Sequence, residues 1–281
     1  MNIEGKVVLI TGASTGIGKS AALEFNKAGA RVAIAARREN LLKEIASGMK
    51  EAFVIKTDLS NEKQARAMVD KTVSHYGRID ILINNAATSI VSSSDIVKRE
   101  DLLYAFATNL LGPVAATQQS LNYMAKQGGG HIINIGTPGF MIGVPFYTPY
   151  VCSKAAFSAW TRTIQGEWAG TGIIVSEYFP GYTETGAVAQ SDRGPVSQDL
   201  VVNKGGSFLA KYFSGARTGE DVARDLVALA KRPKSLMYST FMERLAAIIS
   251  NIPGIRIPVS RRMAETARKK LGLTVFEKIK K

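Results

Sequence analysis

The sequence contains one cysteine, Cys152, and two histidines among its 281 residues. A single cysteine excludes a disulfide within the chain and any metal site built from several cysteines. His75 and His131 are far apart and have no clustered acidic residues beside them, so we expect no metal site. This cysteine usage fits a reducing compartment, so we expect a cytoplasmic location and interpret Cys152 as a buried packing thiol.

Long apolar runs are also lacking. The start of the chain carries an acidic residue and only a short apolar run from Val7 to Ile10. A membrane-spanning helix needs about 20 apolar residues, so we expect neither a secretory signal nor an anchor at this end. Glycine and proline, at 26 and 9 residues, are present in ordinary shares, which excludes a low-complexity chain. The 46% of hydrophobic residues can form one large core or two small ones.

The chain does contain a regular alternation of two patterns. Short runs rich in β-branched residues are separated by longer segments of helical period. Strands that are apolar throughout, with helices between them, indicate a parallel sheet covered on both faces. The sequence therefore predicts a doubly wound α/β (Rossmann) fold of about seven strands. The predicted strands are Lys6–Thr11, Arg31–Ala36, Ala52–Thr57, Ile79–Asn84, His131–Gly136, Ile173–Phe179 and Ser235–Ser239. The predicted helices are Gly16–Ala28, Asn40–Ser47, Glu62–Tyr76, Asp101–Lys126, Ser153–Gly170 and Gly219–Arg232.

We expect residues 1–240 to form a single Rossmann-type domain, because no stretch before residue 240 has the composition of an interdomain linker. Residues 182–217 break the alternation, with scattered Gly, Ser, Gln and Asn and no clear period. Ligands in open α/β sheets lie beyond the carboxyl ends of the strands, and this segment follows the sixth predicted strand. We interpret it as a substrate lid, with a passive loop as the alternative.

A glycine-rich turn follows the first predicted strand directly and leads into the first predicted helix. Gly12 permits a tight turn, while Gly16 and Gly18 let the backbone approach a pyrophosphate at the helix N-terminus. The alternative is an ordinary strand-to-helix turn, but this position at the start of the sheet favours nucleotide binding. The candidate binding residues here are Gly12, Ser14, Thr15, Gly16, Ile17 and Gly18.

The end of the second predicted strand bears on the choice of dinucleotide. An NAD site places a carboxylate there to hold the ribose 2′-hydroxyl, whereas this chain has Ala36 followed by Arg37 and Arg38. A guanidinium can hold the oxygens of a 2′-phosphate, with Arg37 foremost and the Ser14 hydroxyl as a further donor. We therefore expect NADP(H) in preference to NAD(H). The alternative is that both arginines merely solvate the start of a helix.

Tyr150 and Lys154 lie four residues apart, one helical turn, and so share a helix face. A free phenol has a pKa near ~10 and is a poor proton donor or acceptor at neutral pH. A neighbouring cation favours the phenolate and lowers that pKa. The pair alone is equally typical of a surface contact, so the interpretation depends on motifs elsewhere in the chain.

Taken together, the motifs resemble the short-chain dehydrogenase/reductase family, in its short single-domain branch, from Lys6 to about Thr185. They are the TGxxxGIG turn, Asp58-Leu59, Asn84-Asn85-Ala86-Ala87 where the family has NNAG, Asn109, Thr137 where it usually has Ser, the YxxxK pair and Pro180-Gly181. The resemblance implies that Asp58 and Leu59 lie at the adenine. It also implies a cleft lined by Asn85, Ala86 and Ala87, with Pro180, Gly181, Thr183 and Thr185 near the nicotinamide or phosphates.

The resemblance implies hydride transfer between a nicotinamide cofactor and a hydrophobic ketone, aldehyde or secondary alcohol. In it, Tyr150 gives or takes the proton, and Lys154 lowers the pKa of the phenol and holds the nicotinamide ribose. Thr137 orients the substrate oxygen, and Asn109 supports a proton relay. The alternative is a non-catalytic protein that senses dinucleotide; the intact Tyr–Lys–Asn set favours the enzyme, and the Thr at 137 favours the alternative. The family also implies a homodimer or homotetramer formed through the fourth and fifth helices.

The remaining residues, 241–281, form a basic extension. The formal net charge of the chain is +13, and this extension carries ten Lys and Arg against three Glu, or +7. Phe241–Ser250 is apolar on one face, and Ser260–Leu271 reads as a basic helix. Three interpretations stay open: a helical hairpin packed on its own domain or a sister subunit, contact with an anionic membrane surface, and nucleic-acid binding. No nucleic-acid-binding motif accompanies the charge, so we expect no nucleic acid partner.

Overall fold

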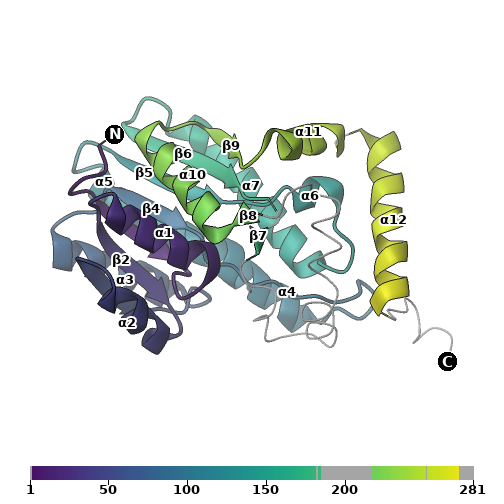
Figure 1. Cartoon of the computed structure of the whole chain (residues 1–281), viewed down its shortest axis with the longest axis horizontal. Coiled ribbons are helices and arrows are strands. Elements are labelled where there is room, and N and C mark those ends of the chain that lie inside the picture. The colour runs from purple at the N-terminus through teal and green to yellow at the C-terminus, as the bar shows by residue number, and fades with distance from the viewer. Residues whose placement is uncertain (1, 182, 185–216, 251, 272–281) are drawn as a thin grey trace.

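A computed structural model describes residues 2–181, 183–184, 217–250 and 252–271. At its centre lies a seven-stranded sheet in the order β3-β2-β1-β4-β5-β6-β9 (Figure 1). Neighbouring strands pair in parallel throughout. The doubly wound α/β fold predicted from the alternation is thus confirmed. The strands are β1 (Val7–Thr11), β2 (Arg31–Ala36), β3 (Ala52–Lys56), β4 (Ile81–Asn84), β5 (Gly130–Ile135), β6 (Ile173–Phe179) and β9 (Leu236–Tyr238).

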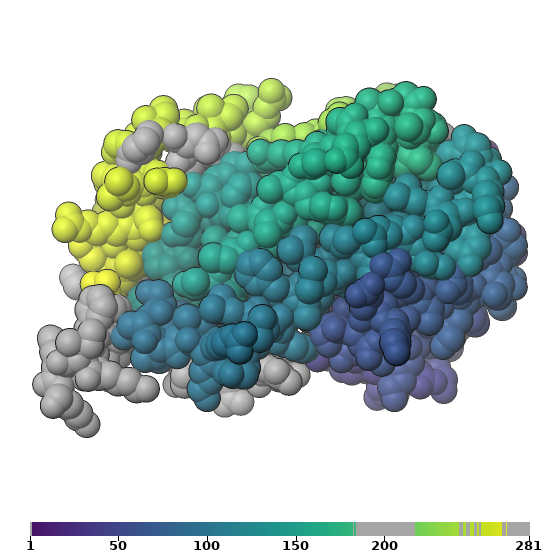
Figure 2. Space-filling model, turned by 180° about the vertical axis from the view of Figure 1, so that it is seen from behind, coloured from purple at the N-terminus to yellow at the C-terminus, as the bar shows by residue number. Residues whose placement is uncertain are grey.

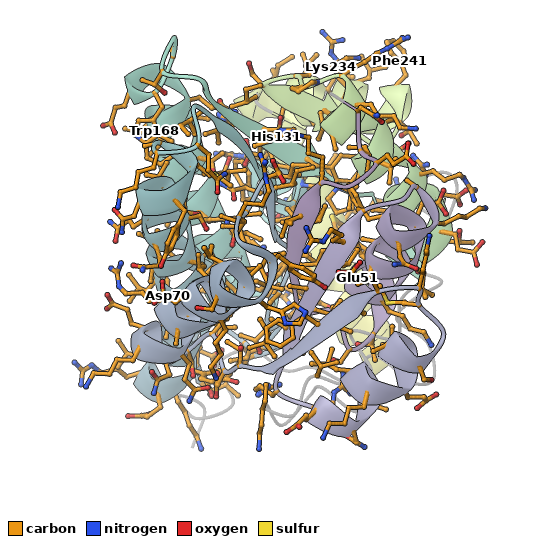
Figure 3. The ribbon with its side chains drawn as sticks, turned by 90° about the vertical axis from the view of Figure 1, so that its left-hand side faces the viewer. Glu51, Asp70, His131, Trp168, Lys234 and Phe241 are labelled. Atoms are coloured by element: carbon orange, nitrogen blue, oxygen red, sulfur yellow. The ribbon has the colours of Figure 1, made fainter. Side chains whose placement is uncertain are left out.

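Helices cover both faces of the sheet because successive strand residues point to opposite sides. In β1, Val8 and Ile10 join the core under one helical layer, while Val7 and Leu9 join the core under the other. In Figure 3, which looks along the sheet, Asp70 and Trp168 lie in the second layer and His131 lies within the sheet. The first layer holds α1 (Gly16–Lys27), α2 (Glu39–Ser47) and α10 (Gly219–Lys231). The second holds α3 (Glu62–Tyr76), α5 (Gly112–Met124) and α7 (Thr148–Glu167).

The strand order reverses its direction at β1. Strands β2 and β3 extend from one side of β1, and β4, β5, β6 and β9 extend from the other. Where two neighbouring connections leave in opposite directions, a crevice opens at the carboxyl ends of the strands. The glycine-rich turn and the segments that begin with Arg37, Asp58, Asn85 and Thr137 follow carboxyl ends, so the topology brings them to this edge.

The helix predicted over 101–126 is divided in the structure. It consists of α4 (Arg99–Phe106), a π-helical turn η1 (Ala107–Leu111) and α5. Pro113 has no N–H, so it cannot supply the hydrogen bond that an α-helix would direct to the carbonyl of Asn109. The site residue Asn109 therefore lies in a widened turn. Helix α7 begins at Thr148, earlier than predicted, with Pro149 in its first turn, so Tyr150 is already helical.

The extension forms two helices, α11 (Phe241–Ser250) and α12 (Pro253–Leu271), at the end of the molecule opposite α1 and α2 (Figures 1 and 2). Helix α12 begins seven residues before the predicted Ser260 and includes Pro258. It contacts the segment around α6 (Gly139–Ile142): the Ser260 hydroxyl donates to the Gly143 carbonyl at 2.9 Å. None of the described helices combines the length and the hydropathy that crossing a membrane requires.

The predicted lid, residues 182–217, lies almost entirely outside the described residues. Its described ends pair with each other as β7 (Thr183–Glu184) and β8 (Arg217–Thr218). The Thr183 hydroxyl donates to the Gly181 carbonyl at 2.9 Å. Thr185, one of the predicted cofactor contacts, lies outside the described part of the chain.

Candidate active site

The glycine-rich turn between β1 and α1 forms a tight cradle. Gly12 has φ +68° and Gly16 has φ +57°, conformations that favour glycine. A Cβ on Gly12 would lie 2.7 Å from the Cα of Ala86, and one on Gly18 would collide with the Gly12 carbonyl oxygen. Thr15 precedes the helix, and its side chain does not cap it. The first turn of α1 contains no acidic residue, which leaves its positive end suited to an anion.

Two neighbouring arginines follow β2 and point to different partners. Arg38 Nη2 donates to Ser14 Oγ at 2.9 Å and to Thr15 Oγ1 at 3.0 Å. Arg37 Nη1 instead donates to the Tyr104 hydroxyl on α4 at 2.7 Å. The sequence pointed first to Arg37 as the phosphate ligand, but in the structure Arg38 is the guanidinium that joins the glycine-rich turn.

The segment after β4 fastens the two central strands together at the crevice. Asn85 Nδ2 donates to the Thr11 carbonyl at 2.8 Å, and the backbone N–H groups of Asn85 and Ala86 both donate to Thr11 Oγ1. Ala87, which stands where the family has glycine, is exposed. These hydrogen bonds explain why Asn-Asn-Ala follows a buried strand. The side-chain amide of Asn85 and the backbone N–H groups of Asn85 and Ala86 hold the turn after β4 against the end of β1.

Asp58 and Leu59 follow β3 at the same edge of the sheet. The Asp58 carboxylate accepts from the backbone N–H and the hydroxyl of Ser60, at 2.9 and 2.8 Å. Leu59 is buried, and its carbonyl lies so close to Gly112 that a side chain there would collide with it. Leu59 therefore positions the start of α5, and Asp58 caps the turn that holds Leu59 in place.

Tyr150 and Thr137 meet although they lie on different elements. Tyr150 is in the first turn of α7, and Thr137 follows β5. Burial raises the pKa of Tyr150, and a hydrogen bond with Thr137 lowers it. Thr137 Oγ1 accepts from the Gly139 N–H at 3.1 Å, which leaves its own O–H as the donor toward the phenol. The role predicted for Lys154, to lower this pKa as a neighbouring cation, stays a prediction; the Thr137 hydroxyl acts on the phenol in the same direction.

Lys154 lies one turn further along α7 and is buried. Its Nζ donates to the Ile135 carbonyl at 2.7 Å, and it lies 5.3 Å from the centre of the Phe157 ring. Burial lowers the pKa of Lys154 to about 8, and the negative charge of Glu177 opposes that shift. The ammonium of Lys154 therefore loses its proton at a lower pH than a solvated lysine does, because burial penalises the charged form.

Asn109, in the π-helical turn, is fully buried and uses both ends of its amide. Its Oδ1 accepts from the Thr88 N–H at 2.7 Å, and its Nδ2 donates to the Thr88 carbonyl at 2.9 Å. The same Nδ2 donates to Ser153 Oγ at 2.9 Å, and that hydroxyl donates to the Tyr150 carbonyl. Asn109 thus ties the segment after β4 to the first turn of α7.

Comparison with known proteins decides the family. The model of the family described as short chain dehydrogenase matches residues 6–195, more than half of the chain. The chain belongs to the short chain dehydrogenase family. It is therefore an oxidoreductase by family. This confirms the resemblance seen in the sequence motifs.

Two of the relatives show how far the likeness extends. An uncharacterized oxidoreductase of Thermotoga maritima is 38% identical over 206 residues, covering 72% of this chain and 81% of its own. Dehydrogenase/reductase SDR family member 7B of Danio rerio is 31% identical over 287 aligned positions, covering 96% of this chain and 88% of its own. The second likeness therefore includes most of the basic extension.

Among solved structures, the 3-ketoacyl-(acyl-carrier-protein) reductase of Brucella melitensis, complexed with NADH, superposes with a TM-score of 0.74. It is 24% identical, and the match covers 84% of this chain and 96% of that one. The alcohol dehydrogenase of Thermococcus sibiricus, complexed with 5-hydroxy-NADP, gives a TM-score of 0.69 at 23% identity, covering 84% and 95%. At these identities the likeness establishes the fold.

The structure also brings forward residues that the motifs do not reveal. Ser153, inside the YxxxK segment, connects Asn109 to α7, and its spacing of three from Tyr150 could have revealed it. Glu177 is a carboxylate buried in the middle of β6. Cys152 is exposed, not buried as predicted, because position 152 is about 200° around the helix from Tyr150. Within the described residues, no three or more His, Cys, Asp or Glu side chains gather as metal ligands would.

Proposed function

We propose that the chain is an NADP(H)-preferring reductase or dehydrogenase acting on a hydrophobic ketone, aldehyde or secondary alcohol. The observation that carries this proposal is the pairing of the Tyr150 phenol with the Thr137 hydroxyl, one turn from buried Lys154. The pairing lies at the edge of the sheet that also holds the glycine cradle. A proton donor at the same sheet edge as the glycine cradle supports a reaction that uses a bound dinucleotide.

A nicotinamide dinucleotide, when bound, supplies or accepts the hydride in this chemistry. Tyr150 gives its proton to the substrate oxygen during reduction and takes it back during oxidation. Thr137 has one hydroxyl proton to donate, and it can direct this to the phenol or to the substrate oxygen. Lys154, as an ammonium, stabilises the phenolate that remains after proton transfer and binds the ribose hydroxyls.

The preference for NADP(H) is supported by the surroundings of Arg38. A 2′-phosphate at the end of β2 would meet this guanidinium together with the hydroxyls of Ser14 and Thr15. Ala36, where an NAD site places a carboxylate, leaves no negative charge to repel the phosphate. The glycine cradle fits the pyrophosphate for the same reason that it excludes Cβ atoms, since the backbone can approach closely.

A hydrophobic substrate is supported by the segment between Thr137 and Tyr150. Met141 and Phe146 are buried within it, and Phe140 packs edge-on against Phe179 at the end of β6. Phe146 has φ +67°, a strained conformation for an aromatic residue, and its carbonyl accepts from the Ser92 N–H at 2.9 Å. Apolar side chains in the segment that joins Thr137 to Tyr150 support a hydrophobic substrate.

The experiment that tests the reaction is a panel of carbonyl compounds assayed by NADPH absorbance with the wild-type chain and with Tyr150→Phe. We expect turnover to fall by at least ~10²-fold in the variant, because its proton donor is lost, while NADPH still binds as measured by fluorescence. Near-native turnover in Tyr150→Phe would refute the assignment. A wild-type chain that binds NADPH and reduces no compound of the panel would instead favour the dinucleotide-sensing alternative.

The basic extension favours a second property, attachment to an anionic membrane surface. Phe241, Leu245 and Ile248 recur at intervals of four and three along α11, so they form one stripe, and that stripe faces outward. Phe241 is 73% exposed and Ile248 is 55% exposed; Figure 3 shows Phe241 at the margin of the molecule. Arg244 beside the stripe and Arg256 in α12 are also exposed.

This arrangement suits a lipid surface better than a second copy of the chain. The extension carries a net charge of +7, so two copies that met through it would repel each other. Anionic headgroups attract the arginines, and the interface below them accepts apolar side chains at shallow depth. Packing of α12 on α6 and membrane contact through α11 are compatible, because they use different surfaces of the extension.

We also propose that the chain forms a homodimer or homotetramer through α4, α5 and α7. Leu103 on α4 and Leu111 in η1 support this interface, since each exposes more than half of its surface. Light scattering on the purified chain tests it. A monomer across micromolar concentrations would contradict the proposal.

A further inference from the structure

Helix α7 carries four polar residues at four-residue intervals: Tyr150, Lys154, Ser158 and Arg162. Residues spaced in this way follow one face of a helix, so these side chains form a stripe over three turns. The stripe begins at the proposed active site with Tyr150. It ends at the surface with Arg162, whose side chain is 51% exposed. Lys154 and Ser158, between the two, are buried.

A buried carboxylate lies beneath this stripe. Glu177 of β6 is opposite Asn134 of β5 in the parallel register, and Asn134 points toward α7, where its Nδ2 donates to Thr161 Oγ1 at 2.9 Å. Side chains at paired positions share a face of the sheet, so Glu177 also points toward α7. Its side chain is 2% exposed.

The hydrogen bonding of Glu177 is incomplete. Its Oε2 lies 3.6 Å from Arg162 Nε, a long contact, and its Oε1 has no hydrogen-bond partner among the described residues. Ser158 lies close enough to lower the pKa of Glu177, although its hydroxyl forms no hydrogen bond of regular geometry. A buried carboxylate that is this poorly satisfied destabilises the fold, so its presence in a buried strand indicates a role other than stability.

The charged and titratable groups around Glu177 come from three elements. Arg162 and Lys154 of α7 both lower its pKa against the opposing effect of burial, and Arg162 is the one of the two within 4 Å of the carboxylate. Tyr238 of β9 faces it across the ring of Phe179, and Arg244 of α11 lies near Tyr238. Lys154 is the group in this set that belongs to the proposed active site. Burial lowers the pKa of Lys154, and Glu177 is the charge that raises it.

We propose that Glu177 is a positioning residue that keeps Lys154 in its ammonium form beneath Tyr150. The inference rests on the proposed function, in which the Lys154 ammonium stabilises the Tyr150 phenolate. Arg162 is the half-exposed cation at the surface end of the stripe, and Lys154, eight residues before it on the same helix face, is the buried cation at the active-site end. In this proposal Tyr150 and Lys154 act together with a third ionisable group, the buried carboxylate of Glu177.

Two measurements test this on the full chain, using Glu177→Gln, which keeps the side-chain shape and removes the charge. The first follows the titration of Lys154 by the ¹³Cε NMR shift of labelled lysine, assigned by the signal that Lys154→Arg removes. We expect the midpoint to fall by about one pH unit in Glu177→Gln. Glu177→Asp, which keeps the charge, should restore most of the shift. Glu167→Gln, which removes an exposed charge from the same helix, should leave it unchanged.

The second measurement is the pH profile of kcat/KM with NADPH and a substrate from the panel. The alkaline decline should move to lower pH in Glu177→Gln, giving up to about tenfold lower activity above the decline and little change at pH 6. A Lys154 midpoint in Glu177→Gln equal to that of wild type would overturn the inference, whatever its thermal stability. If the midpoint shifts but wild type reduces no compound, the proposed function fails and the charge relationship stands.

Discussion

The guanidinium of Arg38 lies 2.9 Å from the Ser14 hydroxyl, and this contact joins the turn after β2 to the turn after β1. The adjacent Arg37 points away, to the Tyr104 hydroxyl of α4. Two consecutive arginines thus have separate tasks. Arg37 contacts α4, and Arg38 contacts the turn proposed to bind the 2′-phosphate.

Substitution of Arg38 tests which arginine discriminates between cofactors. In Arg38→Ala we expect kcat/KM with NADPH to fall by about 10- to 100-fold, because charge-assisted hydrogen bonds contribute roughly 1.5–3 kcal/mol. The value with NADH should change little. Arg37→Ala serves as the matched control and should shift the preference less. An equal loss with both cofactors in Arg38→Ala would contradict a role at the 2′-phosphate.

Removal of the Asn109 amide should destabilise the fold as well as slow the reaction. Asn109→Ala leaves the N–H and the carbonyl of Thr88 without their partners in a buried place. We expect a loss of about 2–3 kcal/mol in the free energy of unfolding, measured by urea denaturation. Asn122→Ala, an exposed change on the same helical layer, should lose less than about 0.5 kcal/mol. Equal stabilities of the two variants would disprove the bracing role.

Acid should destabilise the chain through His131. Burial lowers the pKa of His131 to about 4, from 6.5 in the unfolded chain. Since the folded state holds the neutral ring, its contribution is full above pH 6.5 and is lost as pH falls toward 4. Between pH 7 and pH 5 we expect the free energy of unfolding to drop by about 2 kcal/mol from this group.

The control for this effect is the other histidine. His131→Asn should remove most of the pH dependence in this window, whereas His75→Gln, at an exposed position, should leave it in place. Urea denaturation at the two pH values measures both. If His131→Asn keeps the same acid sensitivity as wild type, another group is responsible.

Membrane attachment is tested by flotation with vesicles of phosphatidylcholine, with and without phosphatidylserine. We expect the full chain to float with the anionic vesicles, and salt to weaken the association. Phe241→Ser combined with Ile248→Ser should reduce binding by about tenfold or more, because each apolar side chain contributes roughly 1.5–3 kcal/mol when buried. Leu23→Ser, at an exposed leucine of α1, is the control. Equal recovery with neutral and anionic vesicles would contradict the proposal.

The fold was predictable because its signal is periodic. Every predicted strand is found within two residues of its expected limits, since buried β-branched runs leave little choice of structure. The break at Ala107–Leu111 was missed, although Pro113 signals it: the missing N–H falls where Asn109 needs a donor. The apolar periodicity of residues 101–126 identifies a helix. The widened turn within it depends on one hydrogen bond that is absent, the bond from residue 113 to the Asn109 carbonyl.

The sequence motifs predicted which segments belong to the candidate site, but not which side chains within them form hydrogen bonds with one another. The glycine-rich turn and Asn85 lie together because they follow the carboxyl ends of the neighbouring parallel strands β1 and β4. Which arginine contacts Ser14, and which hydroxyl pairs with the Tyr150 phenol, depend on side-chain directions in turns, and a periodic pattern in the sequence does not specify those directions. Glu177 was overlooked because the other residues of Ile173–Phe179 predict a buried strand even with Ser176 and Glu177 in it.

Strand β5 has His131 near one end and leads into Thr137 at the other. Six strand residues span about 20 Å, so β5 separates the His131 ring, which is predicted to govern acid stability, from the groups proposed for proton transfer. The two responses to pH are consequently separable. Replacing His131 should lower the pH at which the protein unfolds without changing the pH profile of the reaction. Stability in acid and catalytic activity can therefore be adjusted independently at the two ends of β5.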